Sequence, residues 1–292
     1  MKIAWFNDYS IEQYVGGATI TNQIMINEGR KRGHEIIVFT HDQDIKFEHE
    51  LDKFNIIILN NINMFKEGVI SFIIHNKKYV NYVHDYGFCQ YRNLRCDSCN
   101  ENCSPSPFFI KLFANSKLNI FLSPLHLENH KKFFGMTLRD AIFIPSPLEK
   151  GMFHPNKTKK NEYLFVGVLM NHKGINQVLD YADSQKIKLN IAGKKINKEV
   201  AERIDKYHNY LGEFKYEEMP KIYGNYSYML TNPQWDEPFG RVYSEALASG
   251  CNIIKFQKSH KTGIESYNLP NEDMLDLCYS APELFWDEVE KC

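Results

Sequence analysis

The sequence has no long hydrophobic run: no stretch approaches the about 18–20 consecutive apolar residues that a helix needs to cross a bilayer. The first residues, Met1–Asp8, turn polar too early for a secretory signal, and no small-residue cleavage site follows them. Internal repeats and low-complexity tracts are missing as well, and at 43% hydrophobic residues the chain is too apolar to be disordered. These features predict a globular, cytoplasmic protein.

An excess of charge of either sign is also missing. The 292 residues include 35 Lys+Arg and 36 Asp+Glu, a net charge of −1. A dedicated nucleic-acid-binding protein shows a basic excess, so nucleic acid is not expected as a partner, although a local basic face would escape a whole-chain sum. The seven cysteines, an odd number in a chain this long, do not resemble a secreted disulfide framework.

Short apolar, β-branched segments recur along the chain with helical stretches between them. Runs of about four to eight apolar residues without alternation are typical of strands buried on both faces of a parallel sheet. The stretch Gly17–Arg32 is long enough for the crossover helix that a parallel pair of strands requires. The predicted fold class is therefore α/β. The expected strands are Lys2–Asn7, Glu35–Thr40, Asn55–Asn60, Tyr79–His84, Asn119–Ser123, Ala141–Pro145, Tyr163–Leu169, Lys188–Ala192, Tyr226–Thr231 and Asn252–Phe256.

This strand–helix pattern restarts after a segment with three prolines, Pro145, Pro147 and Pro155, followed by a polar stretch. A proline-rich, polar break between two such patterns indicates a linker. The sequence therefore predicts two doubly wound, Rossmann-like domains, residues 1–147 and 148–292, with the final helix free to pack back on the first domain. Ligands of such sheets bind at the carboxyl ends of the strands.

Two acidic residues, Glu237 and Glu245, stand eight positions apart where a loop leads into a helix that opens near Phe239 and Gly240. A glycine at a helix mouth lets backbone N–H groups approach an anion or a sugar hydroxyl closely. With Glu237 in the loop and Glu245 about two turns into the helix, the carboxylates can contact different parts of one ligand. On spacing alone a plainer interpretation is equally good, in which Glu237 favours the helix dipole and Glu245 is a solvated helix residue.

The segment Trp235–Cys251 resembles the Glu-x7-Glu signature of retaining glycosyltransferases of the GT-B fold, most closely glycosyltransferase family 4. The resemblance extends to Glu-Pro-Phe-Gly, Glu-Ala-Leu-Ala and Gly-Cys-Asn-Ile-Ile. It implies a two-domain enzyme whose sheets face a cleft, with Glu237 on the donor sugar and Glu245 on the nucleotide ribose. The backbone amides of Phe239 and Gly240 would contact sugar hydroxyls or the diphosphate, with Arg241 beside them.

Two segments of the first half resemble the family in the same order. Gly16 and Gly17 follow the first strand and match the loop over the donor phosphates, although a Gly-Gly pair after a strand is often only a turn. His84 ends another strand and matches the histidine that lies beside the reacting sugar, with Asp85 placed to orient its imidazole. A lone histidine is more often structural, so this role depends on the whole pattern.

The segment Phe165–Gly174 resembles the first strand and loop of the family's nucleotide domain. That loop usually carries an Arg and, five residues later, a Lys, both on the donor diphosphate. Here Lys173 is present, but Val168 occupies the Arg position. Losing one charge-assisted hydrogen bond costs on the order of 1–3 kcal/mol of donor binding. Three other cations are candidates to compensate: Arg241, Lys194 and Lys195.

Four cysteines fall within fifteen residues after the His84 strand, in the loop 86–105: Cys89, Cys96, Cys99 and Cys103. Four thiolates can close a tetrahedral zinc site, although the spacing is not that of a standard zinc ribbon. An iron–sulfur cluster fits the spacing less well, and a set of reduced thiols is the plain alternative. The basic and aromatic content of the same loop suits recognition of an acceptor.

Aromatic residues and lysines alternate in the predicted helix Phe108–Lys117 and again at Lys131–Phe134. Glycosyltransferases of this fold with lipid acceptors dock on membranes through such surfaces, so a peripheral membrane contact is considered. A helix with a buried apolar stripe and solvated lysines is the better interpretation of the pattern.

Taken with the resemblance, these observations predict a metal-independent retaining glycosyltransferase that uses a nucleotide-diphosphate sugar. Its acceptor, a glycan, a lipid-linked sugar or another molecule, is not specified. The predicted catalytic residues are Glu237, His84 and Lys173, and no cofactor is required beyond a possible structural zinc. Two alternatives stay open: a non-catalytic subunit that binds sugar nucleotides, suggested by Val168, and a sugar-nucleotide epimerase of the same architecture.

Overall fold

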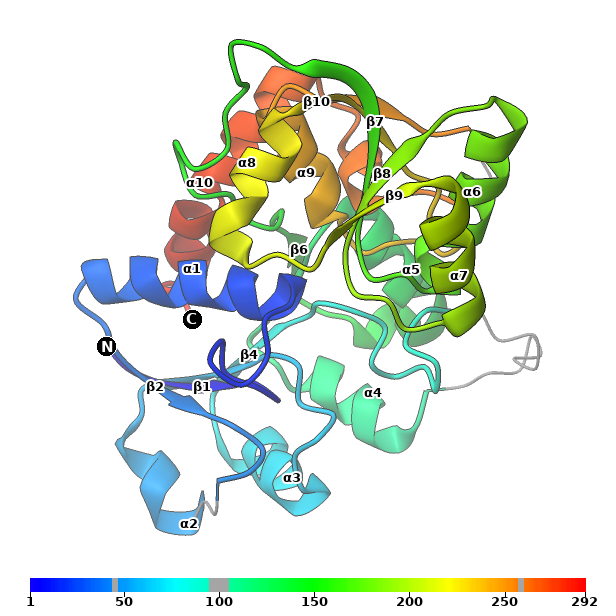
Figure 1. The fold of residues 1–292 in the computed structure, drawn as a ribbon. Coiled ribbons are helices and arrows are strands. Elements are labelled where there is room, and N and C mark those ends of the chain that lie inside the picture. The colour runs from blue at the N-terminus through cyan, green and yellow to red at the C-terminus, as the bar shows by residue number, and fades with distance from the viewer. Residues whose placement is uncertain (44–46, 95–104, 257–259) are drawn as a thin grey trace. The chain divides into compact units, whose positions relative to one another are not determined.

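The computed structural model describes residues 1–43, 47–94, 105–256 and 260–292 (Figure 1). It confirms the α/β fold class, with one parallel sheet of six strands and one of five. The chain divides into two compact units, which are Met1–Pro147 with Leu277–Cys292 and Leu148–Asp276. They are called the first and the second unit below.

The first unit contains the six-stranded sheet, in the order β2-β1-β3-β4-β5-β6, with every pair parallel. Its strands are β1 (Lys2–Phe6), β2 (Glu35–Phe39), β3 (Ile56–Leu59), β4 (Tyr79–Tyr82), β5 (Leu118–Phe121) and β6 (Ala141–Phe143). Its helices are α1 (Gly17–Lys31), α2 (Phe47–Glu50), α3 (Glu67–Asn76), α4 (Pro107–Ala114) and α5 (Pro124–Phe134), together with most of α10 (Asn271–Val289).

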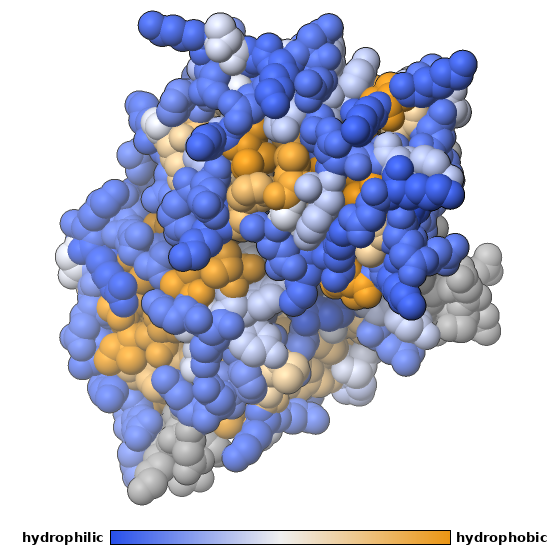
Figure 2. Space-filling model, viewed as in Figure 1, coloured by the Kyte–Doolittle hydropathy of each residue, from blue (hydrophilic) through white to orange (hydrophobic). Residues whose placement is uncertain are grey.

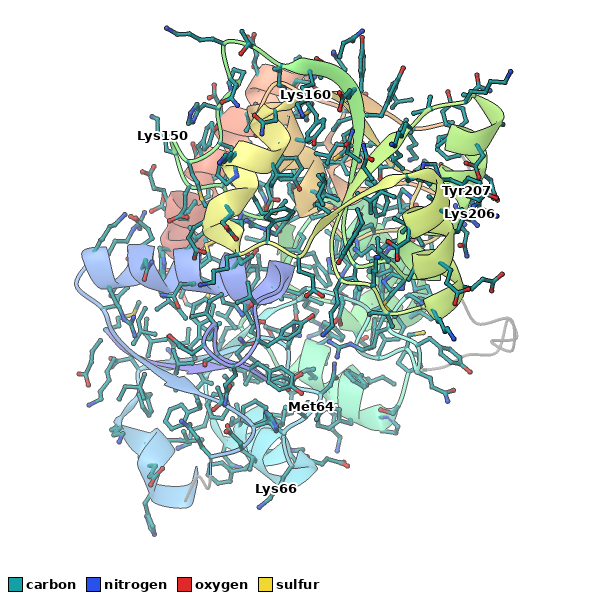
Figure 3. The ribbon with its side chains drawn as sticks, viewed as in Figure 1. Met64, Lys66, Lys150, Lys160, Lys206 and Tyr207 are labelled. Atoms are coloured by element: carbon teal, nitrogen blue, oxygen red, sulfur yellow. The ribbon has the colours of Figure 1, made fainter. Side chains whose placement is uncertain are left out.

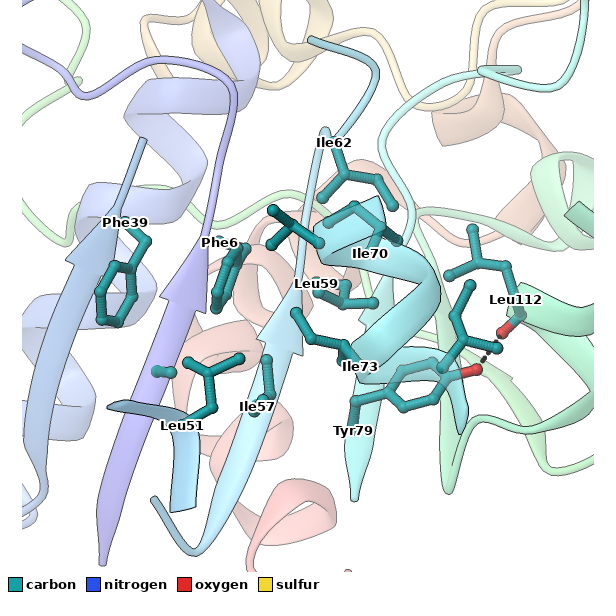
Figure 4. Packing of buried hydrophobic residues seen from close by; sticks show 13 residues of the cluster. Phe6, Phe39, Leu51, Ile57, Leu59, Ile62, Ile70, Ile73, Tyr79 and Leu112 are labelled. Carbon is teal, nitrogen blue, oxygen red and sulfur yellow. Dashed lines mark hydrogen bonds between the residues drawn. The ribbon is translucent and has the colours of Figure 1, made fainter. Parts of the chain in front are cut away.

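One face of this sheet is covered by α3, whose apolar side pairs with the central strands (Figure 4). Ile70 and Ile73 of α3 pack with Phe6 and Leu59, and all four are fully or almost fully buried. Burial of one such side chain contributes about 1.5–3 kcal/mol, so these apolar runs hold the unit together. The Tyr79 hydroxyl donates to the backbone oxygen of Leu112 at 2.7 Å, which satisfies the one polar group of the cluster.

The end of the chain belongs to the first unit as well. Trp286 of α10 is fully buried, and its Nε1 donates to the backbone oxygen of Met25 in α1 at 2.7 Å. Its ring lies 6.3 Å from that of Trp5 in β1. A Cβ on Gly29 would lie 2.2 Å from the Trp286 ring, so the indole needs a glycine at this point of α1.

The second unit contains the five-stranded sheet, in the order β11-β10-β7-β8-β9. Its strands are β7 (Lys160–Val166), β8 (Leu189–Ala192), β9 (Asn209–Gly212), β10 (Tyr226–Leu230) and β11 (Asn252–Ile254). Its helices are α6 (Ile175–Ser184), α7 (Lys198–Tyr207), α8 (Met219–Gly224) and α9 (Arg241–Ala248). Helix α6 buries Ile175, Val178, Leu179 and Ala182, the spacing of one face of a helix, against the sheet.

All ten expected strands are present, and nine of them end one to three residues earlier than expected. About half of the residues that leave the ladder are polar, such as Asn7, Thr40, Asn60 and His84, and they begin the loops at the carboxyl edges of the sheets. The expected helix Phe108–Lys117 ends earlier, at Ala114. Strand β9 was not among the strands expected from apolar runs, because it is short and only partly buried, as an edge strand is.

Hydrophilic side chains predominate on the face shown in Figure 2, and apolar atoms appear there in separate patches. Among the helices in the described ranges, none combines the length and the apolar character that crossing a membrane requires.

Candidate functional site

Three loops at the carboxyl edge of the second sheet pack backbone against backbone. A Cβ on Gly193, after β8, would lie 1.9 Å from the backbone oxygen of Gly167, after β7. A Cβ on Gly174, which precedes α6, would lie 1.8 Å from the backbone oxygen of Asn232, after β10. Gly193 and Gly174 also have positive φ, +144° and +78°, which other residues rarely adopt. Glycine at these points therefore brings the loops after β7, β8 and β10 together.

Lys173 and Glu237 meet where these loops converge. The Lys173 ammonium forms an ion pair with Glu237 Oε1 and lies 5.3 Å from the centre of the Trp235 ring. The Glu237 side chain is 9% exposed and that of Lys173 31% exposed. The Glu237 backbone is fixed on both sides, because its N–H donates to the oxygen of Lys261 at 3.1 Å and its oxygen accepts from Gly263 at 2.8 Å. The sequence named both residues but not their contact.

Helix α9 begins directly after Gly240, which caps it with φ +93°. Its first turn contains no acidic side chain, so no carboxylate of that turn competes with an anion at the positive end of the helix dipole. Phe239 is buried, and its backbone oxygen accepts from the N–H of Ile264 at 2.9 Å. This hydrogen bond from Ile264 thus fixes the loop that leads into α9.

Glu245 is the fifth residue of α9, little more than one turn from its start, and not about two turns as expected. The interpretation of Glu245 as a solvated helix residue is wrong, because the residue is 6% exposed. Its Oε2 accepts from the Tyr223 hydroxyl at 3.1 Å, and its Oε1 lies 3.2 Å from the Arg241 guanidinium. Burial raises the pKa of Glu245, and Arg241 and Tyr223 oppose that rise. Arg241 also donates to the Tyr216 hydroxyl at 2.8 Å.

In the first unit, Gly16 caps helix α1 and Gly17 is its first residue. The N–H of Gly16 donates to Thr19 Oγ1 at 2.9 Å, and α1 has no acidic side chain in its first turn. The start of α1 is therefore open to an anion in the same way as that of α9. A Cβ on Gly16 would lie 2.6 Å from the Tyr14 ring.

His84 lies two residues beyond β4 and is buried, with its ring 4.4 Å from that of Tyr82. The Asp85 carboxylate forms an ion pair with Arg92, and its backbone oxygen lies 3.2 Å from His126 Nε2. Burial raises the pKa of Asp85, while the neighbouring Arg92 lowers it. Arg92 is thus a partner of this carboxylate, and the orientation of the His84 imidazole by Asp85 stays a prediction.

A narrow pocket opens at the same edge of the first sheet and includes His84 in its wall. Sequence reasoning named His84 and Asp85 but missed the asparagines and His130 of its lining, although Asn60 was visible as a polar end to an apolar strand. His130 gave no such signal, because it lies within a helix. The pocket is lined by Asn60, Asn61, Ile62, Asn63, Asn81, Tyr82, Val83, His84, Asp85, Gly87, Phe88, Phe109, Leu112, Phe113 and His130.

Of the four clustered cysteines, only Cys89 lies in a described range, where it is buried. Cys96, Cys99 and Cys103 lie outside the described residues. Within the described part of the chain, no group of three or more His, Cys, Asp or Glu side chains is arranged to hold a metal ion. The zinc site stays a prediction.

Helix α4 has the buried stripe that was the better of the two interpretations of its sequence. Leu112 and Phe113 are buried, and Phe108 and Phe109 pack against the apolar cluster over α3. Ile110 is the one large apolar side chain of α4 that is exposed. Most of the apolar side chains of α4 pack inside the unit, so they do not support membrane contact through this helix, which stays a prediction.

Known proteins resemble this chain in sequence over part of its length and in fold. Residues 149–262 match the family described as Glycosyl transferases group 1, and the matched segment lies within the second unit. It includes Lys173, Glu237 and Glu245. A search of curated protein sequences finds no match.

Solved structures resemble the chain over nearly its whole length. AviGT4, a glycosyltransferase involved in avilamycin A biosynthesis, has 14% identity and a TM-score of 0.64, covering 99% of this chain and 97% of that one. Alr3699/HepE of Anabaena, in complex with UDP and glucose, has 14% identity and a TM-score of 0.63, covering 98% and 94%. BGT of phage T4, in complex with its UDP-glucose substrate, has 12% identity and a TM-score of 0.54, covering 98% and 95%. Likeness at these identities shows the fold, two parallel-sheet α/β domains of the GT-B type.

Proposed function

We propose that this chain is a retaining glycosyltransferase that transfers a sugar from a nucleotide-diphosphate donor without a metal ion. The observation that carries the proposal is the meeting of Lys173 and Glu237 beside the glycine-capped starts of α6 and α9. This arrangement lies inside the segment that matches the group 1 glycosyl transferases. It offers a cation, open backbone amides and a carboxylate within one site.

The chemistry of the donor matches these groups. A diphosphate is stabilised by a lysine ammonium and by N–H groups at helix starts, so Lys173 and the amides at Gly240 bind the leaving group. The Glu237 carboxylate accepts hydrogen bonds from the hydroxyls of the sugar. Glu245 keeps acceptor capacity beyond its contacts with Arg241 and Tyr223, and it accepts from the ribose.

Retention follows when the acceptor attacks from the face that the diphosphate leaves. The departing phosphate oxygen then takes the acceptor proton, so the reaction needs no separate general base. Lys173 and the helix-start amides stabilise the negative charge that develops on the diphosphate. We assign recognition of the acceptor to the first unit. In the same unit we place His84 beside the reacting sugar and the amides of Gly16 and Gly17 on the donor phosphates.

The test starts from a panel of UDP-, GDP- and ADP-sugars in a thermal-shift assay, because a ligand that binds the native state raises its melting temperature. The bound donor is then incubated with candidate acceptors, and the anomeric configuration of the product is determined by NMR. We expect retention, full activity in EDTA, and no transfer by Glu237→Ala. Binding of no sugar nucleotide, an inverted product, or an active Glu237→Ala variant would contradict the proposal.

The non-catalytic alternative is favoured by one observation, Val168 where an Arg is expected from the resemblance. A binding subunit would hold the nucleotide sugar and release no nucleotide diphosphate with any acceptor. An epimerase would change the donor sugar without an acceptor. Release of nucleotide diphosphate that depends on the acceptor separates transfer from both.

A further inference from the structure

We infer that Lys194 supplies the second positive charge that holds the donor diphosphate. The inference rests on the proposed function and adds a residue to the donor site of the second unit. Several cations lie around the carboxyl edge of the second sheet, and most of them form ion pairs with carboxylates.

Three of these cations have acidic partners. Lys173 pairs with Glu237, and Arg241 lies 3.2 Å from Glu245. Lys195 pairs with Asp205 at 2.5 Å. Each pair sums to zero charge, so together they give an anionic ligand little net attraction.

Two of the candidates are also held by aromatic rings. The Lys195 ammonium lies 3.9 Å from the centre of the Tyr210 ring. The Arg241 guanidinium bonds to the Tyr216 hydroxyl and lies 5.6 Å from the centre of that ring. Moving either cation to a phosphate would break an ion pair and a ring contact together.

Lys194 differs from them. Its side chain is exposed, and none of the residues that the structure describes brings a carboxylate within 4.0 Å of its ammonium. Its charge is therefore not neutralised by a neighbour. Sequence reasoning left Lys194, Lys195 and Arg241 as equal candidates, and these contacts separate them.

The position of Lys194 follows from the packing of the glycine loops. The N–H of Leu169 donates to the backbone oxygen of Lys194 at 3.0 Å, one residue after Gly193 packs on Gly167. The loop after β8 thus runs alongside the loop that contains Val168 and leads to Lys173. Lys194 therefore lies beside Val168, on the loop that adjoins the segment from Val168 to Gly174, the cap of α6.

Three other exposed lysines of the second unit differ from Lys194 in position. Lys160 begins β7 and Lys206 lies near the end of α7, so both belong to the opposite, amino-terminal edge of the sheet (Figure 3). Lys261 is exposed near Glu237, but it follows β11, which β10 and β7 separate from β8 in the sheet. It provides a matched control of the same type and exposure.

The experiment uses isothermal titration with the nucleotide diphosphate that gives the wild-type chain its largest thermal shift, and with the matching nucleoside. We expect Lys194→Gln to weaken diphosphate binding about tenfold, the loss of one charge-assisted contact. Nucleoside binding should stay within twofold, because the nucleoside has no phosphate. Lys261→Gln should bind the diphosphate like the wild type, and Lys194→Arg should bind it within threefold.

A second variant tests the position. Val168→Arg in the Lys194→Gln background places a cation on the adjoining loop and should restore most of the lost diphosphate affinity. The inference is overturned if Lys194→Gln binds the diphosphate like the wild type, if it loses nucleoside binding equally, or if the double variant recovers nothing. A wild-type chain that binds no nucleotide diphosphate overturns the proposed function itself, which is a separate result.

Discussion

The ion pair between Lys173 and Glu237 leads to a prediction of unusual sign: Glu237→Gln should bind the nucleotide diphosphate more tightly while losing transfer. In the chain without a donor, the Glu237 carboxylate forms an ion pair with the Lys173 ammonium, the group to which we assign the diphosphate. A diphosphate that binds Lys173 must compete with that carboxylate. Glutamine keeps the shape of the side chain and removes the competing charge.

The magnitude follows from the exposure of the pair. At an effective dielectric constant of about 20, two unit charges about 4 Å apart attract by about 4 kcal/mol. Lys173 is 31% exposed, and desolvation together with the loss of side-chain freedom offsets most of that attraction. About 1 kcal/mol remains for the diphosphate to displace, which corresponds to about a fivefold change in Kd.

The assay is isothermal titration of the nucleotide diphosphate at low and high salt, beside a transfer assay with the sugar nucleotide. Affinity for the diphosphate should rise about fivefold in Glu237→Gln, and the gain should shrink at high salt. Transfer should fall by about a hundredfold or more, because an amide cannot replace a carboxylate that holds the reacting sugar. Asp236→Asn, which changes the net charge equally one residue away, is the control and should do neither. Weaker diphosphate binding by Glu237→Gln would refute the reasoning.

Two further predictions concern stability, measured by urea unfolding. Gly193→Ala should lower the free energy of unfolding by about 3 kcal/mol or more, because its Cβ would meet the oxygen of Gly167 at 1.9 Å and its φ is +144°. Gly68→Ala, where a Cβ meets nothing within 4 Å, should be neutral. Burial lowers the pKa of His130 to about 3. Between this pKa and the higher pKa of the histidine in the unfolded chain, the unfolded chain binds more protons, so the free energy of unfolding decreases as the pH is lowered. From pH 7 to 5 the wild type should therefore lose about 2 kcal/mol more than His130→Phe; equal losses would show that His130 takes its proton without unfolding.

The fold was predictable because the signals that define it are local. The run Ile56–Leu59 is uniformly apolar and uniformly buried, and Gly17–Arg32 has the length of a crossover helix. The strand ends were harder, since apolar residues such as Val83 and Leu122 continue the pattern of a strand but already belong to the loops. Strand β9 gave no apolar signal, because an edge strand needs no continuous apolar run.

The site was predictable in its membership but not in its contacts. Glu237, Glu245 and Lys173 could be named from the motif alone. The ion pair of Glu237 with Lys173 joins residues 64 positions apart that the packing of loops brings together. Arg241 and Glu245 are four positions apart on α9, so the helix itself brings them together, and only the burial of Glu245 depends on tertiary packing. His130 was missed because a histidine inside a helix of mixed polar and apolar residues gives no sign that it lines a pocket.

The pairing of charges explains how an anion site is kept stable in the absence of its ligand. An isolated buried carboxylate such as Glu245 would take up a proton, and Arg241 and Tyr223 stabilise its charged form. Glu237 and Lys173 form a second ion pair, which is the more exposed of the two and lies where the loops that glycine brings together converge. We expect a diphosphate to open the exposed pair, while the buried pair keeps α9 in position. On the proposed function, a cation without a carboxylate partner among the described residues adds attraction that these neutral pairs lack. We therefore expect the charge of Lys194, rather than that of Arg241, to set how tightly the diphosphate is held.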